Sequence, residues 1–307
     1  MSVSFTAGAA MRPLLEPHLP PQVAPRWFTS IDEAIAMARD TEIGWLDVRP
    51  TAPIRDIVMA AGQLRWLNTL FAGTDHFPLD TLVQRGTMMT NGVGVNTIPV
   101  AEYAVMGMLA AAKNFAQVVR IGDAREWPEY APGTAELFES RALIVGMGAI
   151  GQAIAERLAG FGVAVTGVRR RDGVDWRAQL DQYDWVILAA PATAETQHMM
   201  STAEFAAMKP TAWIVNIGRG SLVDQDALVA ALDARAIAGA VLDVTDPEPL
   251  PPAHPLWGRP NVLITMHFSG RSQTRMFERA ARLFLANLDR YLAGEPLHNL
   301  VDLSLGY

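Results

Sequence analysis

The chain of 307 residues contains no cysteine. That absence excludes disulfide scaffolds, thiolate zinc sites, iron–sulfur clusters and cysteine nucleophiles. Positive charge is also scarce, because 25 Lys and Arg residues stand against 32 Asp and Glu residues and leave a net charge of −7. A nucleic-acid-binding surface needs the opposite sign, so we expect no nucleic-acid partner.

Long hydrophobic runs are missing as well. The longest apolar stretches, such as residues 103–112, are much shorter than the ~20 residues that span a bilayer. The first residues lack both a basic start and a continuous apolar segment, so no signal peptide is predicted. We therefore expect a cytoplasmic protein with no membrane partner.

Apolar residues make up 50% of the chain and charged residues 19%, which is enough to bury a large core and excludes wholesale disorder. At about 100–200 residues per domain, the length predicts two domains. In the first hundred residues, the predicted strands are Val3–Thr6, Ile43–Val48, Leu64–Phe71 and Thr87–Val93. The predicted helices between them are Ile31–Arg39, Pro53–Ala61 and Leu79–Arg85. Arg12–Arg26 holds five of the 20 prolines and is predicted to be an irregular connection.

A second alternating series follows Pro99. Its predicted strands are Ala142–Val145, Val163–Val168, Trp185–Ala189, Ala212–Ile217, Gly239–Val244 and Val262–Met266. Its predicted helices are Val100–Ala112, Gln152–Phe161, Gln225–Ala234 and, at the end of the chain, Ser272–Leu292. Gly122–Ser140 is polar, aromatic and interrupted by prolines, which predicts a loop or an arm. The alternation predicts an α/β fold with parallel sheets covered by helices on both faces.

The clearest motif is a glycine-rich loop between the strand Ala142–Val145 and the helix that follows it. In this context a G-x-G-x-x-G pattern predicts a dinucleotide site. Gly146 permits a tight turn, Gly148 lets the backbone approach a pyrophosphate, and Gly151 lets helix and strand pack closely. The N-terminus of the helix then offers free N–H groups to the phosphates. The candidate contacts are Gly146, Met147, Gly148, Ala149, Ile150 and Gly151.

The end of the next strand bears on which dinucleotide binds. An NAD site usually has an acid about 20 residues after the loop, where it binds the ribose hydroxyls. This chain instead has Arg169, Arg170 and Arg171 after Val163–Val168. Arginine can bind the 2′-phosphate of NADP bidentately, so NADPH is favoured over NAD. A solvated basic turn is the alternative interpretation.

Three chemically suitable side chains follow successive strands of the second series. Ligands of open α/β sheets bind at the carboxyl ends of the strands. Arg219 follows Ala212–Ile217, Glu248 follows Gly239–Val244, and His267 follows Val262–Met266. The other histidines lack the spacing of a metal site, and no metal is predicted.

These motifs together resemble the D-isomer-specific 2-hydroxyacid dehydrogenase family, and within it the short glyoxylate/hydroxypyruvate reductases. The likeness covers nearly the whole chain. It is carried by the segments Leu64–Asp75, Val100–Glu102, Gly146–Gly151, Asn216–Gly220, Leu300–Asp302 and Gly306–Tyr307.

The resemblance implies roles for the three side chains, and the chemistry of 2-keto acid reduction supports them. His267 would donate a proton to the substrate oxygen. An imidazole titrates near pH ~6.5 in water, so a carboxylate partner, Glu248, would help to keep it protonated. Arg219 would bind the substrate carboxylate and polarise the carbonyl.

Further contacts are implied by the resemblance alone or by position. The backbone N–H groups of Ala72 and Gly73 would be a second anchor for the substrate carboxylate. Asn96 matches a position near the substrate, although it could also be a routine turn or cap residue. Asp243 and Ser269 match positions that contact the nicotinamide amide, although Asp243 could equally cap the following turn. Pro191, Thr193 and Ile217 complete the candidate cofactor site.

The domain organisation is predicted to be discontinuous. The one helix after residue 271 is too short for a domain of its own and must pack back onto the first series. We therefore expect a flavodoxin-like substrate domain of residues 1–97 plus 272–307. A doubly wound Rossmann cofactor domain of residues 98–271 would be inserted into it, with hinges at both crossings. Trp127, Tyr130 and Phe138 on the predicted arm indicate a homodimer.

Other functions are compatible with the same fold. The chain could use NAD and a different 2-hydroxy acid, or it could be a non-catalytic dinucleotide-sensing regulator. A formate dehydrogenase of this family carries Gln where this chain has Glu248, which argues against that activity. L-Lactate and malate dehydrogenases place the glycine loop near the N-terminus, so chain order disfavours them.

Overall fold

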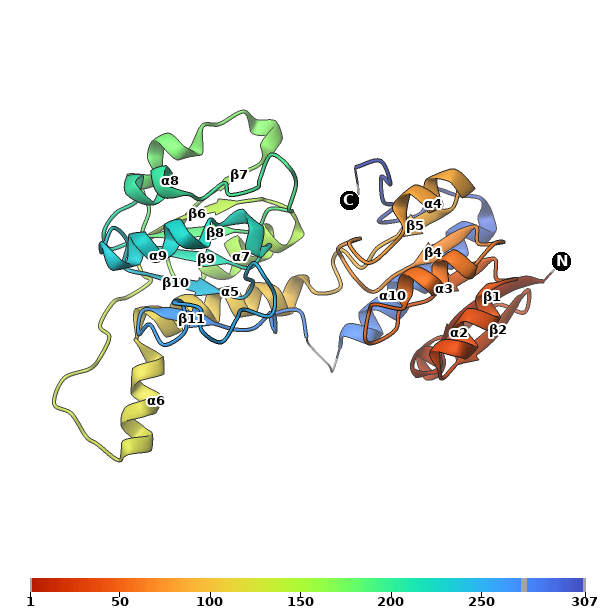
Figure 1. Cartoon of the computed structure of the whole chain (residues 1–307), viewed down its shortest axis with the longest axis horizontal. Helices are drawn as coiled ribbons and strands as arrows, with labels where there is room; N and C mark the ends of the chain where they lie inside the picture. The colour runs from red at the N-terminus through yellow and green to blue at the C-terminus, as the bar shows by residue number, and fades with distance from the viewer. Residues whose placement is uncertain (1, 272–274, 306–307) are drawn as a thin grey trace. The chain divides into compact units, whose positions relative to one another are not determined.

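The computed structural model describes residues 2–271 and 275–305. The chain divides into two compact units, the first comprising Met1–Asn96 with Ser272–Tyr307 and the second Thr97–Arg271 (Figure 1). Among the helices of the described residues, none has both the length and the hydrophobicity that crossing a membrane requires.

A parallel sheet of five strands forms the centre of the first unit, in the order β2-β1-β3-β4-β5. The strands are β1 (Val3–Gly8), β2 (Val23–Phe28), β3 (Ile43–Trp45), β4 (Trp66–Asn68) and β5 (Met88–Thr90). The helices are α1 (Arg12–Leu15), α2 (Ile31–Ala38), α3 (Ile54–Ala60), α4 (Leu79–Arg85) and α10 (Met276–Ala293), with 3₁₀ turns at Ala9–Met11 and Glu16–His18.

The prediction of an irregular Arg12–Arg26 segment is wrong. Short helical turns occupy its first half, and β2 begins at Val23. Proline cannot donate to a ladder of backbone hydrogen bonds, so it is confined to edge strands and strand ends. Because β2 lies at the edge of the sheet, Pro25 can stand inside it, opposite Phe5 of β1.

Helix α10 belongs to the first unit, although the 175 residues of the second unit separate it in sequence from the other elements of the first. Phe284 of this helix is fully buried and stacks on Phe5 and Trp66, with ring centroids 4.8 and 5.1 Å apart. Its predicted start at Ser272 lies outside the described residues, and the helix itself begins at Met276.

A parallel sheet of six strands forms the centre of the second unit, in the order β11-β10-β9-β8-β6-β7. The strands are β6 (Arg141–Val145), β7 (Ala164–Val168), β8 (Trp185–Leu188), β9 (Trp213–Asn216), β10 (Gly239–Leu242) and β11 (Val262–Ile264). The helices are α5 (Thr97–Ala112), α6 (Phe115–Ala124), α7 (Ala149–Ala159), α8 (Thr202–Ala207) and α9 (Gln225–Asp233), and 3₁₀ turns lie at Arg170–Asp172, Trp176–Gln182 and Gly220–Leu222.

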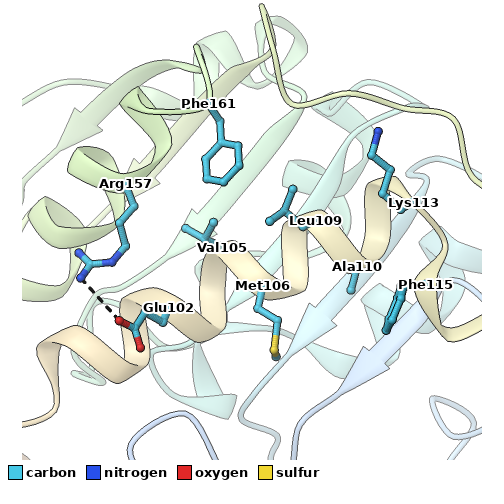
Figure 2. Close-up of a pocket in the computed structure, with 9 residues that line it drawn as sticks. All are labelled: Glu102, Val105, Met106, Leu109, Ala110, Lys113, Phe115, Arg157 and Phe161. Carbon is cyan, nitrogen blue, oxygen red and sulfur yellow. Dashed lines mark ion pairs between the residues drawn. The ribbon is translucent and has the colours of Figure 1, made fainter. Parts of the chain in front are cut away.

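One face of this sheet packs on α5 and α7. Ala142 and Ile144 of β6 point to this side, where they meet Ala104 and Met108 of α5. The outward side of α5 carries an open groove of about 510 Å³ between α5, α7 and Phe115 of α6 (Figure 2). Its walls are mostly apolar, and Glu102 and Arg157 form an ion pair at one end (Figure 2).

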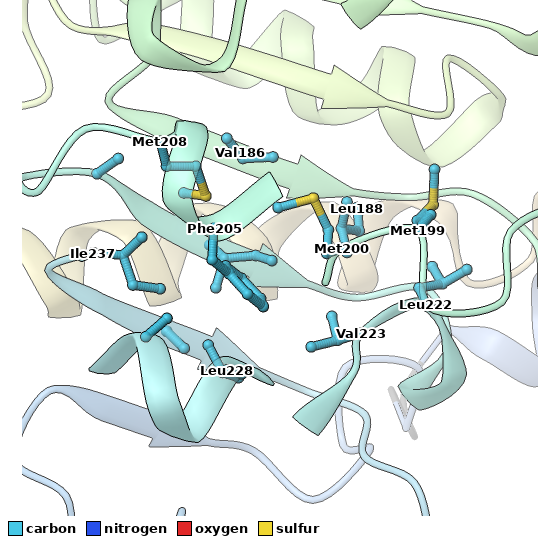
Figure 3. Packing of buried hydrophobic residues seen from close by; sticks show 14 of the residues in the cluster. Val186, Leu188, Met199, Met200, Phe205, Met208, Leu222, Val223, Leu228 and Ile237 are labelled. Atoms are coloured by element: carbon cyan, nitrogen blue, oxygen red, sulfur yellow. The ribbon is translucent and has the colours of Figure 1, made fainter. Parts of the chain in front are cut away.

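The other face packs on α8 and α9. Leu143 and Val145 of β6 point to this side, because successive residues of a strand face opposite ways. Phe205 of α8 lies at the centre of the cluster, close to Leu228 of α9 (Figure 3). Each strand therefore contributes to two cores, which explains its nearly continuous apolar sequence.

Two helices of the second unit differ from the predicted pattern. Helix α6 ends at Ala124, so the first residues of the predicted loop Gly122–Ser140 are helical. Helix α8 was not predicted, although its first turn has a signal for it. Ser201 and Glu204 form a capping box in which each side chain satisfies a backbone group of the other.

Candidate active site

The glycine loop lies where the strand order of the second unit reverses. The chain passes from β6 to β7 on one side, while β8 lies on the other side of β6. Ligands bind at such switch points, outside the carboxyl ends of the strands. Gly146 follows β6 with a φ of +108°, and a Cβ there would lie 2.6 Å from the backbone of Ala189 after β8. A side chain at position 146 would therefore block this turn.

The other two glycines have different surroundings. A Cβ at Gly151 would lie 2.2 Å from the carbonyl oxygen of Gly146, so only glycine allows α7 to pack this closely on the loop. Gly148 faces open space at the N-terminus of α7, and no side chain caps that helix. Uncapped N–H groups beside open space fit a phosphate, so the residues present suit the pyrophosphate of a dinucleotide.

The three arginines after β7 differ in their partners. Arg169 donates from Nε to the carbonyl oxygen of Met147, at 2.9 Å, which ties its guanidinium to the glycine loop. Arg170 pairs with Glu195 at 2.6 Å, and Arg171 is exposed. The nearby acid, Asp172, accepts a hydrogen bond from the backbone N–H of Arg169.

The remaining cofactor candidates follow β8 and β9. Pro191 and Thr193 lie in a turn held by the hydroxyl of Thr196, which contacts the backbone of both. Ile217 is buried in the core on the α5 side of the sheet, and its N–H donates to Leu188 of β8.

His267 and Glu248 form a hydrogen bond. The Nδ1 atom of His267 lies 2.8 Å from Oε2 of Glu248, and both side chains are partly exposed. Burial raises the pKa of Glu248, but the hydrogen bond from His267 and the charges of His267 and Arg219 outweigh it, so the pKa falls below its usual value. Glu248 is therefore a carboxylate at neutral pH and accepts a hydrogen bond from the Nδ1–H group, which leaves Nε2 free for a substrate.

The backbone of His267 adopts the left-handed conformation, with a φ of +56°, and Met266 does the same. Asp243, buried after β10, holds this turn. Its Oδ1 atom accepts from the hydroxyl of Thr265 and from the N–H groups of Phe268 and Ser269. Its other oxygen accepts from the hydroxyl of Ser269. In this structure Asp243 and Ser269 contact each other and organise the histidine turn.

Arg219 stands on the turn after β9, and Asn216 determines the shape of this turn. The fully buried Asn216 side chain donates to the carbonyl oxygen of Arg219 at 2.9 Å and accepts from the N–H of Gly218 at 3.1 Å. A Cβ at Gly220 would lie 2.0 Å from the carbonyl group of Thr245. The arginine turn therefore packs directly on the chain that leads to Glu248, so the structure brings Arg219, Glu248 and His267 together.

The substrate candidates Ala72, Gly73 and Asn96 lie in the first unit. The N–H groups of Ala72 and Gly73 donate to no other described residue, which leaves them available to an anion. Asn96 directly precedes α5, and its buried Oδ1 atom has no hydrogen-bond partner within the described part of the chain.

Several residues that shape the site were not predicted from sequence. Asn216 and Thr265 hold the turns that carry Arg219 and His267, yet each is an ordinary polar residue at the end of a strand. A polar residue at the end of a strand is a weak signal, and only the tertiary structure shows what it binds.

Known proteins resemble this chain in both sequence and structure. A family model described as the NAD binding domain of D-isomer specific 2-hydroxyacid dehydrogenase matches residues 105–269. A glyoxylate reductase from Thermofilum pendens is 34% identical, over 80% of this chain and 77% of the relative.

Two solved structures share the fold. A D-isomer specific 2-hydroxyacid dehydrogenase family protein from Aeromonas salmonicida has a TM-score of 0.86 and 28% identity, covering 98% of this chain and 99% of its own. An NADPH-dependent glyoxylate/hydroxypyruvate reductase from Sinorhizobium meliloti, in complex with NADP and malonate, has a TM-score of 0.75 and 26% identity and covers 99% of this chain and 98% of its own.

Proposed function

The chain belongs to the D-isomer specific 2-hydroxyacid dehydrogenase family, and we propose that it reduces a small 2-keto acid of the glyoxylate or hydroxypyruvate class with NADPH. The product would be the D-2-hydroxy acid. The observation that carries this proposal is the hydrogen bond between His267 and Glu248, formed beside Arg219 at the carboxyl edge of a dinucleotide-binding sheet. The relatives that are named glyoxylate reductases support the substrate class.

The proposed chemistry assigns one task to each side chain. NADPH, when bound, supplies the hydride. His267 gives the proton on Nε2 to the substrate oxygen, and it takes a proton back when the reaction runs towards oxidation. Glu248 holds the imidazole by Nδ1 and stabilises its charged form. Because the left-handed turn at His267 is anchored by Asp243, the ring is oriented before substrate arrives.

Binding of the substrate carboxylate is assigned to Arg219, whose planar guanidinium matches a carboxylate. Its positive charge acts on Glu248 and would also polarise the substrate carbonyl. The free N–H groups of Ala72 and Gly73 are proposed as a second anchor, and Asn96 as a further contact with the substrate.

The preference for NADPH rests on the arginines after β7. Arg169 is tied to the glycine loop, next to the place where the ribose of a dinucleotide is bound in this fold. The acid that would repel a 2′-phosphate does not stand directly after β7, where Arg169 follows Val168, and the nearby Asp172 accepts a hydrogen bond from the backbone N–H of Arg169. The proposed cofactor contacts otherwise remain those of the loop Gly146–Gly151, with Pro191, Thr193, Ile217, Asp243 and Ser269.

An assay of the purified protein with a panel of 2-keto acids tests the function and the cofactor together. We expect glyoxylate and hydroxypyruvate to be reduced, with kcat/KM for NADPH at least about 10-fold above that for NADH, because one charge-assisted phosphate contact is worth ~1.5 kcal/mol or more. A preference for NADH would overturn the cofactor assignment. Binding of NADPH without turnover of any 2-keto acid would favour a dinucleotide sensor instead.

A homodimer is also part of this proposal. Trp127 and Tyr130 on the arm are 98% and 80% exposed. Helix α6 also exposes Val119 and Phe115, and Phe115 lines the groove on α5 (Figure 2). A monomer rarely leaves so much apolar surface open to water. Light scattering at micromolar concentration should give about twice the mass of one chain, and Trp127→Ser with Phe115→Ser should shift the protein towards monomer. A monomeric wild-type protein would contradict this assignment.

A further inference from the structure

Strand β4 of the first unit is followed by the segment Thr69–Gly73, which ends at Ala72 and Gly73, whose N–H groups donate to no other described residue. Because β4 lies between β3 and β5 in the sheet, this segment lies between the chain that follows β3 and the chain that follows β5. On the β5 side, Asn91 donates to the carbonyl oxygen of Ala72 at 3.0 Å, and the N–H of Gly92 donates to Phe71 at 2.8 Å. On the β3 side, the contacts come from Asp47.

The carboxylate of Asp47 accepts three hydrogen bonds. The hydroxyl of Thr69 donates to Oδ1 at 2.7 Å, while the N–H of Leu70 and the indole Nε1 of Trp45 donate to Oδ2 at 2.6 and 2.9 Å. The Thr69 hydroxyl in turn accepts from the N–H of Phe71 at 3.1 Å. Asp47 therefore satisfies, directly or through Thr69, the two N–H groups that precede Ala72.

A carboxylate suits this position better than any neutral side chain. An ionised Asp accepts at both oxygens and donates nothing, so it can take all three donors. An amide has one accepting oxygen, and its NH₂ group would face a donor on the other side. Loss of the solvent around Asp47 raises its pKa to about 6, against the hydrogen bonds and the charge of Arg49. The surroundings of Asp47 therefore disfavour its ionised form by burial, while the three hydrogen bonds favour it.

The side chain of Phe71 is held from the same direction. The guanidinium of Arg49 lies 5.1 Å from the centre of its ring, and the His76 ring meets it edge-on at 5.7 Å. Two residues of the segment after β3, Asp47 and Arg49, thus hold the backbone and the ring of the segment after β4. The mechanism described above uses neither of them.

We infer that Asp47 is a positioning residue for substrate binding, whose carboxylate fixes the Thr69–Phe71 segment so that the N–H groups of Ala72 and Gly73 stay in the geometry that an incoming carboxylate needs. This inference rests on the proposed function, because it assumes that these N–H groups bind the substrate. Since the hydrogen bonds of Asp47 all run to Trp45, Thr69 and Leu70, its proposed effect is on binding of the 2-keto acid, and the chemical step is left to His267.

Asp47→Asn separates this role from general stability. We expect KM for glyoxylate to rise about 10-fold, since one part-buried donor loses its acceptor, while kcat and KM for NADPH change less than about twofold. Thr69→Val breaks the same network without changing charge and should raise KM similarly, and the double variant should be no worse than the worse single one. Asp56→Asn, which removes an exposed carboxylate from α3 of the same unit, is the matched control and should behave as wild type.

The pH profile gives a second readout. Asp47 is ionised above pH ~6, so KM for glyoxylate in the wild type should rise as the pH falls below that value. Asp47→Asn should lack the rise in KM at acid pH.

Unchanged KM in both Asp47→Asn and Thr69→Val, with an active wild type, would overturn the positioning role alone. An inactive wild type with bound NADPH would overturn the proposed function and this inference with it.

Discussion

His267→Ala is expected to lower kcat for 2-keto acid reduction by about 10²–10⁴-fold, the usual contribution of a general acid or base. The imidazole is removed from a turn whose backbone is held by Asp243, so the site should keep its shape while losing its proton donor. Steady-state kinetics with NADPH, together with NADPH affinity by fluorescence titration, would check this. Affinity for NADPH should stay within about threefold of wild type, because the phosphate cradle is formed by other strands.

His254→Ala is the matched control for this experiment. His254 lies in the same unit, where its Nδ1 atom accepts from the N–H of Leu256 and forms no hydrogen bond with Arg219, Glu248 or His267 among the described residues. The variant should turn over at close to the wild-type rate. Turnover in His267→Ala that equals that of His254→Ala would remove His267 from the mechanism.

Phe284→Ala should destabilise the first unit by about 3–5 kcal/mol, the usual cost of deleting a buried aromatic ring. Phe284 is fully buried, stacks on Phe5 and Trp66, and lies 5.4 Å from the ring of Trp45. These contacts attach a helix from the end of the chain to strands from its beginning. Because the two units have separate cores, the loss should fall on the first unit. Urea unfolding followed by tryptophan fluorescence, to which Trp45 and Trp66 of the first unit contribute, should detect an earlier transition.

Phe277→Ala provides the comparison. Phe277 lies on the same helix but is 39% exposed, so its removal should cost less than about 1 kcal/mol. NADPH binding should survive in both variants, since the glycine loop belongs to the second unit. Equal effects of the two substitutions would show that α10 is not held by the aromatic cluster.

Much of the fold could be predicted because buried parallel strands and amphipathic helices leave strong local patterns. The apolar run at Ala142–Val145 and the glycines after it predict a strand, a turn and a helix, and the structure has all three. The prediction failed at β2, where five nearby prolines concealed a strand that only its edge position permits. It also missed α8, whose six residues are too few for a helical period to show.

The sequence by itself determined the family, the glycine loop and the chemically able residues Arg219, Glu248 and His267, because these depend on residue type and on order along the chain. Only the tertiary structure decided which polar groups meet. In the folded chain, His267 forms a hydrogen bond with Glu248. Asn216 and Asp243 form hydrogen bonds with the turns that carry Arg219 and His267, and Asp47 does so with the segment after β4. Hydrogen bonds join residues up to 26 positions apart in these turns. Such partners depend on which strands become neighbours in the sheet, and local sequence patterns do not record that.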